Sequence, residues 1–281
     1  MIEYIIIAVL QGLFEWLPIS SSGQTMIISI NLFGISAENA FSLAIWLHLG
    51  TTIAVLLKFR KDFIRIFKTL LHNDLDVNKV DLSKRNWLIY ATIGTGITAV
   101  PLYFIIKIVF IDVFTSIQGD ILTLIISGFL ILTGIILIKT RKIDGTNKII
   151  EVSKSRIKKD SFLSGLTQGV SILPGISRSG VTTSTILLQK YEQHDALTLS
   201  FLMSVPVAIA SIIVDILFGN GSVFGSLSVA TIIVVTFVSF ITGYLAIDLL
   251  ISLAKKLNFG YFCVLYGVFA YVFIIPFLII T

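Results

Sequence analysis

Two stretches far apart in the chain have nearly the same sequence. The first is Gln11-Gly-Leu-Phe-Glu-Trp-Leu-Pro-Ile-Ser-Ser-Ser-Gly23, and the second is Gln168-Gly-Val-Ser-Ile-Leu-Pro-Gly-Ile-Ser-Arg-Ser-Gly180. An interrupted apolar segment at corresponding positions of two halves of a membrane protein indicates a binding site near the bilayer midplane. The copies differ chemically, since only the first has a carboxylate, Glu15, and only the second has a cation, Arg178.

The rest of the chain is strongly apolar. Hydrophobic residues make up 56% of the 281 residues and charged residues only 13%, whereas soluble domains have about 25% charged residues. The mean hydropathy is +0.97, and long uncharged runs are typical of a chain that spans lipid. The single Cys263 excludes an internal disulfide and gives no metal-binding pattern.

Six apolar runs are long enough to cross about 30 Å of hydrocarbon. We expect these spans at Asn39–Phe59, Trp87–Ile111, Ile121–Ile138, Ala196–Phe218, Leu227–Leu253 and Phe259–Ile280. The polar segments 61–86 and 140–161 are expected to be solvated connectors without chemistry. Within the first of them, Asp62–Leu71 is weakly amphipathic and is expected at the membrane surface.

Two further apolar runs, Tyr4–Leu17 and Phe162–Leu173, are too short to cross, because each would rise about 20 Å as a helix. Each meets a Leu-Pro pair, and the residue before a proline is biased out of the helical region. A second short arm follows in each case, Gln24–Phe33 or Val181–Gln189. We interpret each pair of arms as a re-entrant hairpin whose loop lies at the midplane, covered by protein or by a watery cavity.

One hairpin and three crossings in each half place the second half in the opposite orientation. The predicted fold is therefore an all-α integral membrane protein with six transmembrane helices plus two re-entrant helical hairpins in an inverted-topology repeat. We expect a single membrane domain over residues 1–281. Its parts are repeat one at 1–139 with hairpin 4–33, a cytoplasmic connector at 140–160, and repeat two at 161–281 with hairpin 162–189.

The basic residues agree with this topology. Of the 21 Lys and Arg residues, 19 lie in the four segments that it places inside, which are 58–85, 139–159, 190 and 255–256. This is the pattern of the positive-inside rule, so the net charge of +5 does not indicate a nucleic-acid partner. Lys107 lies near the outer end of its span and can snorkel. Arg178 is the cation that no loop explains.

Glu15 lies one turn after Gln11, so the two side chains share a helix face. An ionisable residue costs at least about 2.5 kcal/mol at the bilayer centre. We interpret Glu15 as a general base or a divalent-metal ligand; the alternative is a carboxyl group at an interface or hydrogen-bonded across helices. His48, in the middle of its span, is a functional candidate, but a hydrogen bond to a neighbouring helix explains it equally well.

The serine-rich ends supply hydroxyl and backbone N–H groups at the start of each return arm, which is an anion-binding arrangement. The candidate phosphate ligands are Ser20, Ser22 and Gly23 in the first copy, with Ser21 beside them, and Ser177, Ser179, Gly180 and Thr182 in the second. Arg178 adds a guanidinium group that can give two parallel hydrogen bonds to phosphate. Either loop alone also fits an ordinary turn that caps a helix. The two together indicate a phosphate or diphosphate at the end of a lipid.

These motifs resemble those of the undecaprenyl-diphosphate phosphatases of the bacitracin-resistance type. Residues 11–23 look like the first signature of that family and 174–180 like the second, and the resemblance covers the whole chain, including 201–206. It implies a multi-pass enzyme of the cell membrane. Such an enzyme removes the terminal phosphate of a long-chain polyprenyl diphosphate at the outer side, assisted by Mg²⁺ or Ca²⁺, and so recycles the lipid carrier for cell-envelope glycans.

Carried over by position, Glu15 matches the second carboxylate of the family's motif. The resemblance also makes Glu15 a candidate metal ligand. Ser21 matches the proposed nucleophile and Arg178 the phosphate-binding arginine, with Ser177 and Thr182 as its polar companions. These assignments come from the resemblance alone.

Two positions depart from the family pattern. Gln11 stands where many members have a glutamate, and Gln24 stands where many have a histidine. Glutamine cannot transfer a proton as histidine does, so we hypothesise that His48 takes part of that role. The departure at Gln24 also suggests an archaeal relative that acts on a dolichol-type lipid.

Two functions remain open from the sequence. In a phosphatase, either Ser21 attacks phosphorus after activation by Glu15 or Glu15 orients a water. The alternative is a transporter or flippase for a prenyl phosphate, because inverted repeats with interrupted helices are also transporter architecture. The prenyl chain length, the metal and the oligomeric state are not fixed by the sequence.

Overall fold

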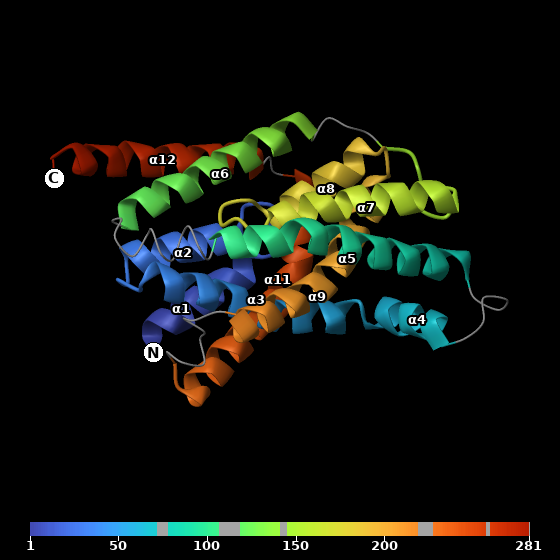
Figure 1. Cartoon of the computed structure of the whole chain (residues 1–281), viewed down its shortest axis with the longest axis horizontal. Coiled ribbons are helices and arrows are strands. Elements are labelled where there is room, and N and C mark those ends of the chain that lie inside the picture. Colours follow the sequence, from blue (N-terminus) through green and yellow to red (C-terminus); the bar gives the residue numbers. More distant parts are fainter. Residues whose placement is uncertain (72–77, 107–118, 141–144, 219–226, 257–258, 281) are drawn as a thin grey trace.

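The computed structural model describes residues 1–71, 78–106, 119–140, 145–218, 227–256 and 259–280 (Figure 1). These residues form eleven helices and no β-strand. Five of the helices, α3, α5, α6, α9 and α11, are long and apolar enough to cross a membrane. The protein is therefore an all-helical, multi-pass membrane protein.

Each of the six expected spans overlaps a helix, and both expected hairpins are pairs of short helices. The helices are α1 (Ile2–Phe14), α2 (Ser21–Asn31), α3 (Ala37–Lys58), α4 (Arg60–Leu71), α5 (Lys79–Ile106), α6 (Gly119–Thr140), α7 (Lys154–Val170), α8 (Arg178–Leu188), α9 (Gln193–Phe218), α11 (Val229–Lys256) and α12 (Phe259–Ile280). Lys107 and the end of its expected span lie outside the described residues.

The segments expected to be connectors are more helical than predicted. Helix α4 occupies the beginning of the first one, up to Leu71, α5 begins at Lys79 rather than near Trp87, and α7 begins at Lys154 rather than at Phe162. Apolar runs mark only the part of a helix that lipid or protein covers, so they give no signal for turns that continue into water. The connector expected at 140–160 therefore ends earlier than predicted.

Serine caps set the start of both return arms. Ser20 Oγ accepts a hydrogen bond from the Gly23 N–H (3.4 Å), and Ser177 Oγ accepts one from the Gly180 N–H (3.1 Å). Such caps satisfy N–H groups that have no partner inside the helix. Both return helices consequently begin three residues earlier than expected, at the residue after the capping serine.

The two hairpin ends lie against each other. A Cβ atom on Gly23 would lie 2.7 Å from the Gly175 nitrogen, so the two backbones are in direct contact. Gly175 has a φ of +97°, a conformation that side chains disfavour. In addition, the Ser179 hydroxyl donates to the Leu17 carbonyl (3.2 Å). The tips meet, as the sequence predicted.

Each hairpin also packs on a long helix from the other half of the chain. Helix α1 lies along α11, and α7 lies along α5 (Figure 1). Corresponding glycines allow both approaches, because a Cβ on Gly12 would lie 1.9 Å from Thr242 Oγ1 and one on Gly169 would lie 1.8 Å from Thr98 Oγ1. Helices α3 and α9 pair, as do α6 and α12. The two halves therefore interlock around the tips.

A polar network holds the base of the second hairpin. The buried Asp160 carboxylate accepts hydrogen bonds from Arg156 Nε (3.2 Å) and the Tyr191 hydroxyl (3.1 Å). Burial and the neighbouring Asp160 carboxylate raise the pKa of the Tyr191 phenol well above its usual range. The phenol therefore stays protonated, and this hydrogen bond persists over the physiological pH range.

The contact between the tips predicts that adding a methyl group lowers stability at Gly23 but not at Gly96. Gly23→Ala should lower stability by about 1–3 kcal/mol, because overpacking pushes the backbones apart. Gly96→Ala, in α5, is the matched control, since its added Cβ would meet nothing within 4 Å. The thermal midpoint in detergent can be read with a thiol-reactive dye, because the sole Cys263 is buried. Equal midpoints for the two variants would contradict the contact.

Candidate active site

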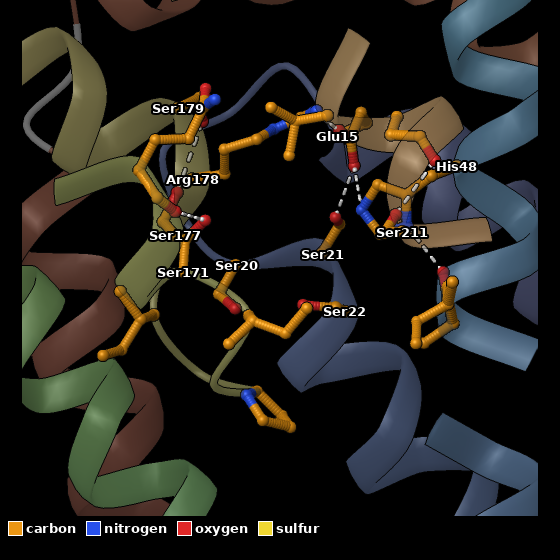
Figure 2. A pocket seen from close by; sticks show the side chains of 18 of the residues that line it. Glu15, Ser20, Ser21, Ser22, His48, Ser171, Ser177, Arg178, Ser179 and Ser211 are labelled. Atoms are coloured by element: carbon orange, nitrogen blue, oxygen red, sulfur yellow. Dashed lines mark hydrogen bonds and ion pairs between the residues drawn. The ribbon is translucent and has the colours of Figure 1, made fainter. Parts of the chain in front are cut away.

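A cavity of about 90 Å³ lies where the two hairpin tips meet. The polar residues labelled in Figure 2 line it: Glu15, Ser20, Ser21, Ser22, His48, Ser171, Ser177, Arg178, Ser179 and Ser211. They come from both hairpins and from α3 and α9. The cavity thus unites residues that are far apart in the sequence.

Glu15 is the centre of the polar contacts in this cavity. The residue is 4% exposed, and its Oε2 accepts hydrogen bonds from Ser21 Oγ (2.7 Å) and Gln11 Nε2 (2.8 Å). Ser20, just before Ser21, has a φ of 57°, and this left-handed conformation turns the chain from the loop into α2. A hydroxyl held against a carboxylate is the arrangement of an activated nucleophile.

Arg178 reaches Glu15 from the second hairpin and forms an ion pair with Oε1. Both side chains are largely buried, with 17% and 3% of their surfaces exposed. Arg178 Nη1 also donates to the Ser204 carbonyl (3.4 Å). Buried charges are tolerated when they are paired and hydrogen-bonded, and guanidinium has five N–H donors. Arg178 therefore keeps donors for an anion in the cavity.

His48 contacts the same carboxylate from α3. Its Nδ1 lies 2.6 Å from the Ala44 carbonyl, which can only accept, so this nitrogen carries a hydrogen. Its Nε2 lies 3.4 Å from Glu15 Oε2. The backbone bond fixes the ring with its Nε2 toward the Glu15 carboxylate. The structure thus places His48 in the site rather than against a neighbouring helix alone.

Gln11 contributes an unpaired oxygen. Its amide nitrogen faces Glu15, as it must because a carboxylate only accepts. The buried Oε1 has no partner among the described residues, and the same is true of Oε1 of the corresponding Gln168. A buried oxygen without a partner is unfavourable, so Gln11 Oε1 is suited to a water or a cation.

Several predicted ligands do not line the cavity. The Gly23 and Gly180 N–H groups are used by the serine caps. Thr182 is fully buried and shares a hydrogen bond with Ser200 (2.5 Å). Gln24 donates to the Ile19 carbonyl (2.8 Å) and so fixes the first hairpin loop. These residues shape the tips and have no place in the cavity wall.

Other lining residues gave no sequence signal. They lie on α3, α5 and α9: Phe41, Ala44, Ile45, Thr95, Ala99, Val207, Ala208 and Ser211. Asp215 of α9 is 7% exposed and accepts hydrogen bonds from Ser42 Oγ (2.7 Å) and the Tyr103 hydroxyl (3.3 Å). Apolar residues surround these helices on all sides, so periodicity could not show which face is inside.

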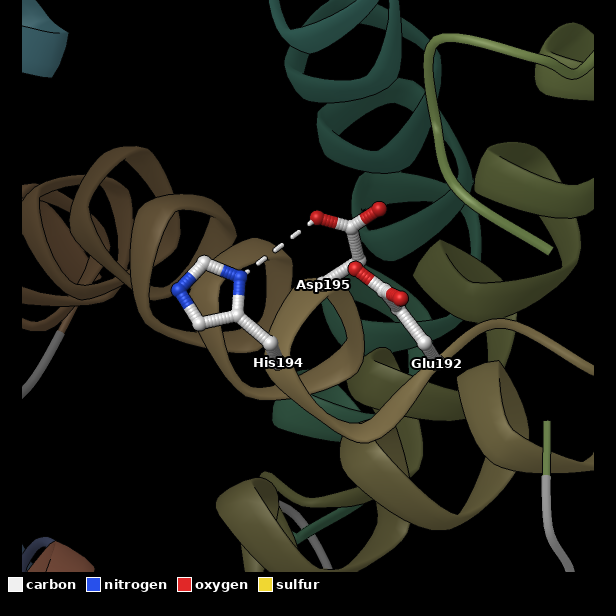
Figure 3. A group of neighbouring side chains, drawn as sticks. All are labelled: Glu192, His194 and Asp195. Atoms are coloured by element: carbon white, nitrogen blue, oxygen red, sulfur yellow. Dashed lines mark ion pairs between the residues drawn. The ribbon is translucent and has the colours of Figure 1, made fainter. Parts of the chain in front are cut away.

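A second acidic group lies away from the cavity, at the start of α9. The ligand atoms of Glu192, His194 and Asp195 lie within 4.8 Å of one another (Figure 3). However, Asp195 Oδ2 already accepts from the Ile149 N–H (2.7 Å), and the His194 side chain is 83% exposed. Acidic residues are ordinary at a helix N-terminus, so we assign no metal to this group.

The fold and the cavity define a multi-pass membrane protein with an acid, a hydroxyl and a guanidinium buried between two hairpins. A model of the family described as "Bacitracin resistance protein BacA" matches residues 4–272. The chain belongs to this family.

Relatives similar over nearly the whole chain are named "Undecaprenyl-diphosphatase". The protein of Methanothrix thermoacetophila is 38% identical over 266 residues, which cover 95% of this chain and 94% of the relative. That of Methanococcoides burtonii is 38% identical over 273 residues and 95% of each chain. That of Haloarcula marismortui is 30% identical over 272 residues, covering 94% and 93%. Archaeal proteins are thus among the relatives.

The buried ion pair predicts a large cost of removing its acid. Glu15→Ala leaves the Arg178 guanidinium without its ion-pair partner. Because a guanidinium stays charged in proteins, the buried charge remains and stability should fall by about 3–5 kcal/mol. Asp248→Ala is the matched control, because Asp248 pairs with Lys58 but its side chain is 74% exposed, and exposed pairs contribute about 1 kcal/mol or less. Thermal unfolding in detergent compares the two. Similar losses for both variants would argue against a buried pair.

Proposed function

We propose that the protein hydrolyses a long-chain polyprenyl diphosphate to the monophosphate and so recycles a lipid carrier for cell-envelope glycans. The observation that carries this proposal is the single set of contacts among Ser21, Glu15 and Arg178 in the cavity. The names of the relatives agree with it.

The geometry suits phosphoryl transfer. Ser21 Oγ attacks the terminal phosphorus and its proton passes to Glu15 Oε2. The bond from phosphorus to the bridging oxygen breaks, and the leaving prenyl monophosphate takes this proton, which returns Glu15 to the carboxylate form. Water then hydrolyses the phosphoserine with Glu15 as base. Arg178 exchanges part of its contact with Glu15 for the phosphate oxygens and stabilises the charge of the transition state. If Glu15 instead orients water, Arg178 keeps the same role.

We further propose an inverted-topology repeat with six crossings and two re-entrant hairpins, the first open to the outside and the second to the cytoplasm. Helix pairs that correspond between the two halves pack in the same way, which supports the repeat. The packing of α1 on α11 corresponds to that of α7 on α5, and the packing of α3 on α11 to that of α9 on α5. With basic segments inside, the phosphate site is reached from the outer side of the cell membrane.

A divalent cation, Mg²⁺ or Ca²⁺, fits the site as a partner of the diphosphate. Glu15, which lines the cavity, is the carboxylate that would hold it; Gln11 Oε1 is buried without a partner among the described residues, but Gln11 does not line the cavity. Magnesium is commonly bound by one or two carboxylates together with substrate phosphates. The ion would neutralise phosphate charge, in addition to Arg178.

The transporter alternative is less well supported. Transport of a prenyl phosphate needs a cation for the phosphate, which Arg178 supplies, but it does not need a hydroxyl hydrogen-bonded to a carboxylate. The contact between Ser21 and Glu15 is therefore the feature that separates the two functions.

The direct test is phosphate release from a C55 polyprenyl diphosphate by the purified protein, with and without EDTA. We expect release that EDTA suppresses. Arg178→Ala should lower kcat/KM by at least about a hundredfold, which corresponds to several kcal/mol of lost transition-state stabilisation. Activity of Arg178→Ala within tenfold of the native protein would remove Arg178 from the chemistry. Absence of release under every metal condition, with lipid movement in liposomes, would favour transport.

His48 provides an independent prediction. His48→Ala removes the nitrogen beside Glu15 and should lower turnover by about ten- to a hundredfold, within the range of general acid–base effects. His194→Ala is the control, because this histidine is exposed and distant from the cavity lining. Initial rates of phosphate release measure both. Near-normal turnover of His48→Ala would exclude it from the proton transfers.

A further inference from the structure

An apolar crevice adjoins the cavity at the outer ends of α3, α5 and α6. Ala37, Ile106 and Leu122 line it, together with Met26, Phe41 and Pro174. The last three residues also line the cavity that contains Glu15 and Arg178. The crevice therefore continues the cavity, and its walls change from charged and hydroxyl-bearing to apolar.

The crevice lies between the end of α5 and the start of α6, two helices that pack chiefly on different neighbours. Helix α5 packs on α4, α7 and α9, whereas α6 packs on α2, α8 and α12. The loop of the second hairpin contacts both, with Gly175 against Ile126 of α6 and Ile172 packed against the apolar cluster that contains Tyr103 of α5. On other sides of the cavity, α3 packs on α9 and α1 on α11.

The residues next to the crevice on α5 and α6 are apolar and exposed. Ile105 exposes 54% of its surface and Ile121 exposes 38%, next to the crevice residues Ile106 and Leu122, which are 3% and 2% exposed. Side chains of this kind on the outside of a membrane protein face lipid. A chain that left the cavity through the crevice would thus pass directly into the hydrocarbon.

We propose that this crevice holds the first isoprene units of the polyprenyl tail, while the diphosphate lies against Arg178. The inference rests on the proposed function, which requires a charged head group and an uncharged tail to be bound together. Among the described residues that line the crevice, Glu38 is the one with a charge, and its carboxylate disfavours a phosphate there. The orientation of the substrate, with head inward and tail between α5 and α6, follows.

Phe41 is the specificity-determining residue in this arrangement. The crevice has a volume of about 20 Å³, which is room for about one water. An isoprene unit therefore enters only when Phe41 or Met26, which border both spaces, rotates away. Met26 is unbranched and adapts to such a change. Phe41 is larger and packs beside the Tyr103 ring, with 6.5 Å between ring centroids, so it controls the width of the passage.

Chain-length selectivity tests the assignment. Ala37→Phe narrows the crevice and should raise KM for the C55 diphosphate about tenfold, equivalent to the loss of about two buried methylene groups. The change should be less than about twofold for the shortest prenyl diphosphate that the native protein hydrolyses. Val229→Phe is the matched control, because Val229 is also the first residue of a long helix, but it is 69% exposed and lies outside the crevice.

Phe41→Ala keeps the test decisive if the bulkier variant does not fold. It should lower the ratio of KM for the C55 diphosphate to KM for the short substrate, because an effect on the cavity that Phe41 also lines would change both KM values alike. Equal effects on both substrates, or none on the C55 diphosphate in either variant, would overturn the tail assignment while the phosphatase function stands. Failure of the native protein to hydrolyse any prenyl diphosphate would instead reject the proposed function.

Discussion

The structure depends on one ion pair, which joins Glu15 of the first hairpin to Arg178 of the second. Neither charge could remain alone at this depth, because an unpaired ion in a low-dielectric interior costs several kcal/mol. The pair requires both tips to reach the same level, and the backbone contact of Gly23 with Gly175 shows that they do. Ser21 and His48 then acquire their positions relative to a fixed carboxylate.

The two copies of the repeat are equivalent in backbone and different in chemistry. Both use a serine as helix cap and a glycine to approach a partner helix. The position that carries Glu15 in the first copy carries Ile172 in the second, and the position of Ser21 corresponds to Arg178. Repetition therefore supplies two similar supports, while differences at two positions supply the carboxylate, the hydroxyl and the guanidinium group.

Much of this arrangement could be predicted from sequence, because it depends on local signals. Pro18 and Pro174 indicate where the apolar segments are interrupted. Arg178 lies outside the basic segments that the positive-inside rule explains, and this indicates a site residue. Apart from His48, the contributions of α3 and α9 could not be predicted, since these helices are apolar on all faces. The direction of Gln24, the burial of Asp215 and the use of glycine N–H groups for capping depend on tertiary packing, which spacing alone does not encode.

The interlocked packing of α1 on α11 has a consequence for biosynthesis. Helix α1 is synthesised well before its partner and finds it only when Val229–Lys256 has been inserted, so the contact spans most of the chain, and contacts at such separation form slowly. Glu15 lacks its ion-pair partner until Arg178 has been inserted, and α1 lacks its packing partner until α11 follows. We therefore expect a long-lived assembly intermediate in which α1 is not yet packed, and its completion depends on the C-terminal third. In such a protein, folding of the first half is conditional on synthesis of the second.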